Sequence, residues 1–243
     1  MLKLMYITND PTVAKIAADA GVDRIFIDME VLGKAERQGG MDTVQSHHTP
    51  EDIAKVRAAI GDQAEIMARV NPMNSNSQTE IDDAIANGAD VIMLPMWRTV
   101  DDLRQLVRMV NGRAKVMPLL ETDTAADNLP EAVKVSGIDQ MHIGLNDLHL
   151  CYHQKFMFQL LTDGTVDQIG VYLENSGQHG NRLLRRRPAR LGDTSGRVYH
   201  RRALPSRLAV CHSVPQLLQH GEDDGLGRDT AYLHRGRGGY PPR

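Results

Sequence analysis

Three helix-like stretches of this 243-residue chain end in the same way, with Gly-x-Asp placed directly before an apolar run. These endings are Gly21-Val-Asp23, Gly88-Ala-Asp90 and Gly137-Ile-Asp139. A glycine just past a helix tolerates the left-handed conformation that closes the helix, and the next residues lead the chain into a strand. The repeated ending therefore predicts a regular alternation of helices and strands.

Apolar runs of strand length occur throughout the first part of the chain, at Leu2 to Ile7, Arg24 to Ile27, Ile66 to Val70, Val91 to Leu94, Val116 to Leu120 and Met141 to Ile143. Helix-like stretches lie between most of them, and two of these begin with a threonine cap and first-turn acids, at Thr49 and Thr99. The runs are too apolar for a one-faced antiparallel sheet. We therefore predict a parallel α/β sheet that is covered on both faces.

Both an eight-stranded barrel and an open, doubly wound sheet follow from this alternation. An open nucleotide-binding sheet would show a glycine-rich first turn, but the first run is followed by Thr8-Asn-Asp-Pro11. In a barrel, functional groups gather at the carboxyl ends of several strands. Charged residues at several strand ends favour the (βα)8 TIM barrel.

Those charged residues are one arginine and four acids. Arg69 ends the third run, Glu121 follows the fifth and Asp147 follows the sixth, while Asp28 and Glu30 follow the second. Because the carboxyl ends of parallel strands meet at one rim, we expect these side chains to lie together. Taken singly, Glu121 or Asp147 is better explained as a helix cap. Taken together, they favour a functional site.

Carboxylate oxygens suit Mg²⁺ or Mn²⁺, and a metal with two protein ligands keeps positions open for water and a chelating substrate. Such a metal acts as a Lewis acid on a 2-oxo acid and stabilises the enolate formed when the adjacent carbon–carbon bond breaks. A guanidinium adds hydrogen-bond donors to the developing oxyanion. The predicted partners are thus a small 2-oxo acid and an aldehyde.

Over roughly residues 12 to 165, the sequence resembles the HpcH/HpaI aldolase and citrate lyase family of metal-dependent (βα)8 enzymes. The resemblance is carried by the strand that ends in Arg69 and by three further segments, 87–99, 118–122 and 143–148. It implies that Glu121 and Asp147 are the metal ligands and that Arg69 stabilises the enolate.

The same resemblance implies roles for other positions. Asp28 and Glu30 match the acids of the family's D-x-E-H segment and would order a water or a histidine for proton transfer. The 143–148 segment would contribute to substrate binding through Gly144, Leu145 and Asn146. The resemblance also implies a homo-oligomer, a trimer or a hexamer, if the C-terminus is intact.

The sequence departs from the family pattern after Glu30. Val31 stands where the family has its proton-transfer histidine, and an insertion, Leu32 to Gln45, then leads to His47 and His48. One hypothesis is that one of these histidines, with His48 as the candidate, folds back as a substitute base. The alternative is two solvated loop histidines ahead of a helix cap.

Two further positions bear on the pocket. Leu119 stands where the family often has a glutamine, which leaves the substrate preference open. Trp97 is a candidate for lining the pocket, although packing in the core or at the rim is the safer interpretation.

Composition limits the partners and the location that the protein can have. A formal net charge of −3 argues against a nucleic-acid or anionic-membrane partner for the chain as a whole. The start of the chain lacks the features of a signal peptide, and no run reaches the length of a membrane span, so we predict a soluble, cytoplasmic protein. Cys151 and Cys211 form neither a disulfide framework nor a metal-type spacing, and we interpret them as structurally silent.

The last part of the chain breaks the pattern. Residues 182–243 contain 13 arginines, no lysine and five acids, a net charge of +8, whereas residues 1–181 carry −11. We therefore divide the chain into residues 1–181, with barrel strands 1 to 6 and their helices, and residues 182–243, an aberrant arginine-rich tail. One interpretation of the tail is a disordered RNA-binding segment. Against it, a barrel needs two more strands, and none follows convincingly after Glu174.

A second interpretation is that the tail is a mistranslated remainder of the same barrel. Read one base on, reverse translation of Gly196 to Leu208 permits a helix similar to one in this family, and Cys211 to Gln219 permits an apolar strand. Ala189 to Gly192 stays in the original frame, which implies more than one slip. The shifted frame would complete the barrel and add a terminal helix.

The sequence thus predicts an enzyme, a metal-dependent carbon–carbon lyase acting on the enolate of pyruvate or a similar 2-oxo acid. The alternative within the same fold is an acyl-CoA lyase of the citryl or malyl type. The alternative of another class is a non-catalytic or RNA-binding protein that uses the basic tail.

Overall fold

The computed structural model describes residues 3–33, 46–175 and 208–210. Seven strands lie in these ranges and form one sheet in sequence order, with each neighbouring pair parallel. The strands are β1 (Met5–Ile7), β2 (Arg24–Asp28), β3 (Glu65–Arg69), β4 (Val91–Leu94), β5 (Lys115–Leu120), β6 (Met141–Ile143) and β7 (Leu208–Val210). The six predicted strands are confirmed, with ends that differ from the prediction by three residues or fewer.

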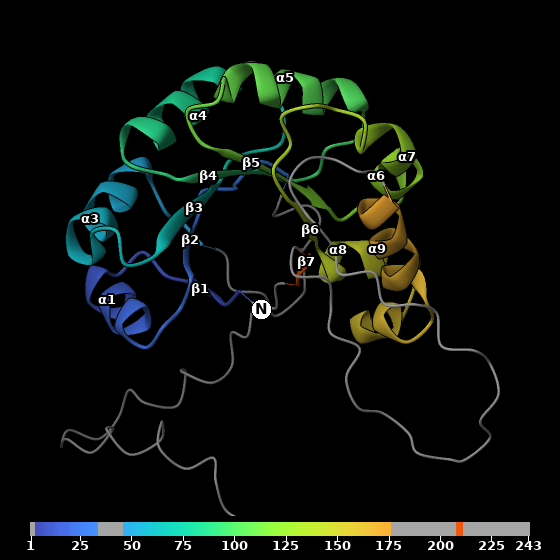
Figure 1. Ribbon diagram of the computed structural model, residues 1–243, viewed down its shortest axis with the longest axis horizontal. Coiled ribbons are helices and arrows are strands. Elements are labelled where there is room, and N and C mark those ends of the chain that lie inside the picture. The colour runs from blue at the N-terminus through green and yellow to red at the C-terminus, as the bar shows by residue number, and fades with distance from the viewer. Residues whose placement is uncertain (1–2, 34–45, 176–207, 211–243) are drawn as a thin grey trace, which may run out of the picture. The chain divides into compact units, whose positions relative to one another are not determined.

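The helices of the first compact unit, residues 1–213, lie on the outer side of the curved sheet (Figure 1). They are α1 (Pro11–Asp19), α3 (Pro50–Ile60), α4 (Ser77–Ala86), α5 (Val100–Val110), α6 (Asp123–Asp127), α7 (Leu129–Ala132), α8 (Leu145–Cys151) and α9 (Thr165–Asn175), with a 3-10 helix η1 (Met157–Leu161). The predicted threonine caps are confirmed, because Thr49 and Thr99 form capping boxes at the starts of α3 and α5.

Both faces of the sheet are buried, as predicted. The outer face and the helices share one large apolar core. The inner face forms a second, smaller core from Phe26, Met67, Val91, Met93, Met117 and Leu119. Because side chains alternate along a strand, β2 points Arg24, Phe26 and Asp28 inward in turn. The apolar middle of the inner face therefore separates two charged ends. One is the lower end, where the strands begin, at Arg24; the other is the upper rim, where the strands end, at Asp28.

The three Gly-x-Asp endings join neighbouring strands in pairs. Each aspartate accepts a hydrogen bond from a backbone N–H at the start of the preceding strand or, for Leu4, directly before it. The N to Oδ2 distances are 2.8 Å for Leu4 and Asp23, 2.7 Å for Ile66 and Asp90, and 2.8 Å for Val116 and Asp139. Each aspartate N–H also donates to the carbonyl of that same residue. The motif thus fixes where β2, β4 and β6 begin relative to β1, β3 and β5.

The glycines of the motif are needed for their conformation. Gly21, Gly88 and Gly137 have φ values of 87°, 104° and 94°, in the left-handed region that other residues rarely adopt. Gly137 is also constrained by space, because a Cβ there would lie 2.6 Å from Val107 Cγ1.

We expect Asp90→Ala to destabilise the fold by about 1–3 kcal/mol, because the Ile66 N–H loses its acceptor and Arg57 loses its ion-pair partner. Asp62→Ala is the control, since Asp62 is fully exposed and lies 3.9 Å from Arg57. Urea unfolding should show a lower midpoint for Asp90→Ala and an unchanged midpoint for Asp62→Ala. Equal midpoints for wild type and Asp90→Ala would show that the motif does not tie the strands together.

The seventh strand was not expected. Leu208–Val210 pairs with β6 over three residues, within the segment assigned to the tail. Three apolar residues beside Arg207 are too short a run to predict a strand from sequence. Within the described ranges, β1 and β7 each pair on one side only, so the sheet is that of an incomplete barrel.

Several sequence predictions fall outside the described residues. These are the 34–45 part of the insertion, Cys211, and the tail apart from Leu208–Val210, including the reading-frame hypothesis. Residues 214–243 lie outside the described residues as well. None of the helices in the described ranges has the length and apolar character needed to cross a bilayer.

Candidate functional site

The charged residues singled out in the sequence lie at the carboxyl ends of the strands. Asp28 and Arg69 are the last residues of β2 and β3 and stand opposite each other in the strand register. Glu121 directly follows β5, and Asp147 lies in the first turn of α8, just after β6. The fold therefore brings this group to one rim, as a parallel sheet requires.

Arg69 and Asp28 form a two-pronged ion pair. The arginine donates from Nε to Oδ1 at 2.8 Å and from Nη2 to Oδ2 at 2.9 Å. Glu30 lies on the same guanidinium, with Oε2 3.3 Å from Nε. The two acids are buried, with side chains 3% and 1% exposed, and the Arg69 guanidinium compensates their charge.

Two further features hold the guanidinium in place. Its carbon lies 5.4 Å from the centre of the Phe26 ring, a cation–π contact inside the barrel. Burial alone would lower the pKa of Arg69, but the hydrogen bond and charge of Asp28, with the charges of Glu30 and Glu121, raise it above its ordinary value. Arg69 is therefore a fixed cation at every pH that the fold tolerates.

Glu121 is a buried carboxyl in an acid-rich setting. Its side chain accepts a hydrogen bond from the backbone N–H of Met96 at 2.9 Å. Burial raises its pKa most, Asp147 and Glu30 raise it further, and Arg69 and the Met96 N–H act in the opposite direction, leaving the pKa at about 8. Near neutral pH the metal-free protein therefore keeps a proton on Glu121, because the site already carries an excess of negative charge.

The contact with Met96 depends on unusual backbone geometry. Met96 has a φ of 51°, which a residue with a side chain adopts at a cost of about 1–2 kcal/mol. Nothing in Pro95-Met96-Trp97 signals this conformation, and sequence reasoning missed the residue. The neighbouring Trp97 is 1% exposed and belongs to the large core, which agrees with a packing role.

Gly144 allows Glu121 to occupy its position. A Cβ at Gly144 would lie 2.9 Å from Glu121 Cβ, 3.1 Å from Oε2 and 3.2 Å from Leu119 Cδ1. Leu145 is buried and Asn146 half-buried at the start of α8. Of the three residues of the 143–148 segment predicted to bind substrate, Gly144 thus lies against the Glu121 carboxylate itself.

His48 folds back onto the rim, and His47 does not. The Nδ1 atom of His48 accepts a hydrogen bond from the backbone N–H of Asp28 at 3.0 Å. His47 is exposed. The backbone of Val31 is anchored, since the N–H groups of Val31 and Leu32 both donate to Asn71 Oδ1 at 2.9 Å. The Val31 side chain is 53% exposed.

The donor set fits a divalent cation. Glu30 and Asp147 both act electrostatically on Glu121, and Arg69 acts on it in the opposite direction. In the described ranges no group of three or more His, Cys, Asp or Glu side chains is arranged to hold a metal. A cation held by Glu121 and Asp147 would thus have two protein ligands and would take up the excess negative charge.

The raised pKa of Glu121 predicts how stability varies with pH. Between about pH 4.5 and pH 8 the folded protein holds a proton on Glu121 that the unfolded chain releases, so the free energy of unfolding falls as pH rises through this range. Metal-free wild type should therefore lose stability relative to Glu121→Gln from pH 5 to pH 8, and Mg²⁺ should offset the loss. Urea midpoints of the two proteins at both pH values measure the effect; a difference that is independent of pH would contradict it.

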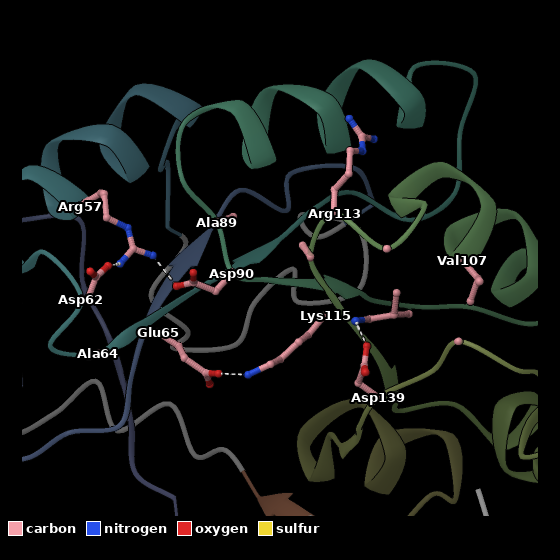
Figure 2. Close-up of a pocket in the computed structure, with 14 residues that line it drawn as sticks. Arg57, Asp62, Ala64, Glu65, Ala89, Asp90, Val107, Arg113, Lys115 and Asp139 are labelled. Carbon is pink, nitrogen blue, oxygen red and sulfur yellow. Dashed lines mark hydrogen bonds and ion pairs between the residues drawn. The ribbon is translucent and has the colours of Figure 1, made fainter. Parts of the chain in front are cut away.

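A cavity of about 620 Å³ lies at the opposite end of the sheet, where β3, β4 and β5 begin (Figure 2). Four of its charged groups form two ion pairs, Lys115 with Glu65 and Arg57 with Asp90. Burial acts to raise the pKa of Glu65, but Lys115 and the buried Arg24 lower it to about 2. These ion pairs lie at the ends where the strands begin, opposite the rim that carries Arg69 and Glu121.

Comparison with solved structures gives the same fold. An HpcH/HpaI aldolase/citrate lyase family protein from Burkholderia cenocepacia J2315 is 18% identical with a TM-score of 0.59, over 73% of this chain and 77% of that one. An HpcH/HpaI aldolase from Desulfitobacterium hafniense DCB-2 is 14% identical with a TM-score of 0.58, over 73% and 76%. The citrate synthase SbnG is 16% identical with a TM-score of 0.59, over 74% and 75%.

Comparison with curated proteins finds no match. The family comparison does: residues 3–155 match the description HpcH/HpaI aldolase/citrate lyase, whose members act on carbon–carbon bonds. The matched range contains β1 to β6 and every residue of the rim described above. The chain therefore belongs to the HpcH/HpaI aldolase/citrate lyase family.

Proposed function

We propose that this chain is a metal-dependent carbon–carbon lyase that forms or cleaves the bond between an aldehyde and the enolate of pyruvate or a similar 2-oxo acid. The observation that carries the proposal is the buried Glu121 carboxyl, with a pKa of about 8, beside a guanidinium fixed by Asp28 and Glu30. A site with this excess of acids is suited to a cation and an anionic substrate that chelates it.

In this proposal Glu121 and Asp147 hold Mg²⁺ or Mn²⁺, which supplies a Lewis acid that polarises the 2-oxo group. Arg69 stabilises the negative charge that develops on the enolate oxygen. Its orientation is set in advance by the fork to Asp28 and by the Phe26 ring, so no reorganisation is needed as the charge develops. Glu30 contacts the same guanidinium at Nε, with its Oε2 3.3 Å away.

The 2-oxo acid also needs room above the rim. Gly144 keeps the backbone of the β6–α8 turn close to Glu121 without a side chain, and Leu145 and Asn146 begin the helix next to it. In the proposal these three residues contact the substrate. The Leu119 side chain lies in the inner core below them and sets an apolar floor.

The proposal extends to the complete fold, the location and the oligomeric state of the protein. We expect a complete (βα)8 barrel, a cytoplasmic location and assembly as a trimer or hexamer, provided that the remaining strand and helix are present in the natural protein.

A release assay tests the function. Purified protein is incubated with a set of 4-hydroxy-2-oxo acids, and pyruvate is measured with a coupled dehydrogenase. We expect cleavage that stops with EDTA and returns with Mg²⁺ or Mn²⁺. Full cleavage after thorough chelation would contradict the metal requirement, and cleavage of citryl or malyl thioesters alone would favour the acyl-CoA lyase instead.

A further inference from the structure

The two carboxyl oxygens of Glu121 lie in different surroundings. Oε1 accepts the hydrogen bond from the backbone N–H of Met96, at 2.9 Å. Oε2 lies beside the backbone of Gly144, where an added Cβ would be only 3.1 Å from it. Within the part of the chain that the structure describes, the Met96 N–H is the hydrogen-bond donor to this carboxyl. Oε2 is therefore the oxygen that can still bind a ligand.

The sheet fixes both neighbours of the Glu121 carboxyl. Met96 follows β4 and Gly144 follows β6, and both of these strands pair with β5, which ends one residue before Glu121. The Gly144 N–H donates to the carbonyl of Leu120 at 2.9 Å, so the β6 side is held close. Oε1 thus lies on the β4 side and Oε2 on the β6 side. Asp147, in the first turn of α8, also comes from the end of β6.

The left-handed backbone of Met96 is enforced by the residues that follow it. The Trp97 side chain is 1% exposed and anchored in the large core. The N–H groups of Arg98 and Thr99 both donate to Asp102 Oδ2, at 3.1 Å and 2.9 Å. Strained backbone of this kind persists where its surroundings hold it, and such residues cluster at functional sites.

Helix closure does not account for the conformation of Met96. In the described ranges, two other residues with side chains have a positive φ, Asn111 at 49° and His153 at 53°. Asn111 is the C-cap of α5, and His153 directly follows the C-cap of α8. A left-handed residue at such a position closes the helix. Met96 instead follows a strand, and what its conformation achieves is the hydrogen bond to Glu121.

We propose that Met96 is a positioning residue: its backbone N–H holds Oε1 of Glu121 and so presents Oε2 to the divalent cation, on the same side as Asp147. The inference rests on the proposed function, since it needs a cation at this rim. The hydrogen bond fixes the orientation of the carboxylate before the cation arrives. Groups that hold a metal ligand in this way typically contribute about 10- to 100-fold to metal affinity.

An amide-to-ester exchange removes the donor alone. The α-hydroxy acid analogue of methionine, incorporated at position 96 of the full chain, replaces the N–H by an ester oxygen and keeps the side chain. The electron paramagnetic resonance signal of free Mn²⁺ then measures metal binding without any assay of activity. We expect the ester protein to bind Mn²⁺ with a Kd about 10- to 100-fold higher than that of wild type.

Ordinary substitutions test the backbone conformation. Met96→Gly keeps the N–H and suits a positive φ, so its Mn²⁺ affinity should stay close to that of wild type. Met96→Val opposes a positive φ and should weaken Mn²⁺ binding as the ester does. Asn111→Val is the matched control, because it places the same backbone strain at the end of α5, next to the residues that line the lower cavity. It should lower the urea midpoint and leave Mn²⁺ binding unchanged.

Weak Mn²⁺ binding by the ester protein, together with wild-type binding by Met96→Gly, supports the positioning role. An ester protein that binds Mn²⁺ as tightly as wild type, or a glycine variant that binds as weakly as the ester, overturns that role and leaves the proposed function standing. If wild type itself binds no Mn²⁺, the proposed function fails as well. The ester and the valine variant disturb the same contact by different means, so one of them decides if the other unfolds.

Discussion

Replacing Arg69 with alanine should abolish carbon–carbon bond cleavage and also destabilise the fold by about 3–5 kcal/mol. Asp28 and Glu30 would stay buried without the cation that now compensates them, since their side chains are 3% and 1% exposed. Arg69→Lys should rescue only part of this loss. A lysine restores the charge but not the planar fork that matches both oxygens of Asp28.

Urea unfolding and the pyruvate-release assay measure the two effects of Arg69→Ala. Lys134→Ala is the control for losing one cation from an ion pair, because Lys134 and Glu131 are 66% and 62% exposed and should contribute within about 0.5 kcal/mol. An Arg69→Ala protein that unfolds at the wild-type urea concentration would refute the compensating role of Arg69.

Replacing Glu121 with alanine should remove the response to metal. The proposal makes this carboxylate one of two protein ligands, and loss of the Lewis acid costs several kcal/mol of transition-state stabilisation, or on the order of 10³-fold in kcat. Added Mg²⁺ or Mn²⁺ should then neither activate the variant nor raise its urea midpoint.

The fold of the Glu121→Ala protein should survive, because the variant loses a buried carboxyl that the metal-free site keeps protonated. Asp123→Ala is the matched control, since Asp123 is an exposed acid two residues later in the chain. If Mg²⁺ activated the Glu121→Ala variant as strongly as it activates wild type, Glu121 would not be a metal ligand.

The sheet could be predicted from the sequence because its rules are local. Apolar runs of strand length and repeated Gly-x-Asp endings fix six strands and their parallel order, and each run appears in the structure. That the motif also joins neighbouring strands was not predictable. The hydrogen bonds that Asp23, Asp90 and Asp139 accept can be placed only when the strand register is known. The short strand Leu208–Val210 depends on pairing with β6 and has no signal of its own.

The gathering of acids and Arg69 at one rim was predictable for the same topological reason. The electrostatic detail was not, because the pKa of Glu121 results from burial and from charges brought together by four strands. The left-handed Met96 and the contact of His48 with the Asp28 N–H depend on backbone groups that a sequence does not locate. The position of His48 against Asp28 also bridges an insertion, across which sequence spacing carries no information.

The reading-frame hypothesis for residues 182–243 stays a prediction. Sequencing the coding DNA from codon 165 onward, with an intact mass of the purified protein, tests it. A verified gene and a mass that match the present tail would reject it. In that case a salt-dependent shift of RNA that disappears on truncation after residue 181 would favour the RNA-binding alternative.

The central claim is that the rim stabilises an enolate with the help of a divalent cation. Exchange of the methyl protons of pyruvate for deuterium, followed by proton NMR in D₂O, measures that step without an aldehyde partner. We predict exchange above the protein-free background with Mg²⁺ or Mn²⁺, none with EDTA, and none in Glu121→Ala. Exchange that continues at full rate in EDTA, or that is absent from wild type supplied with metal, would contradict the account.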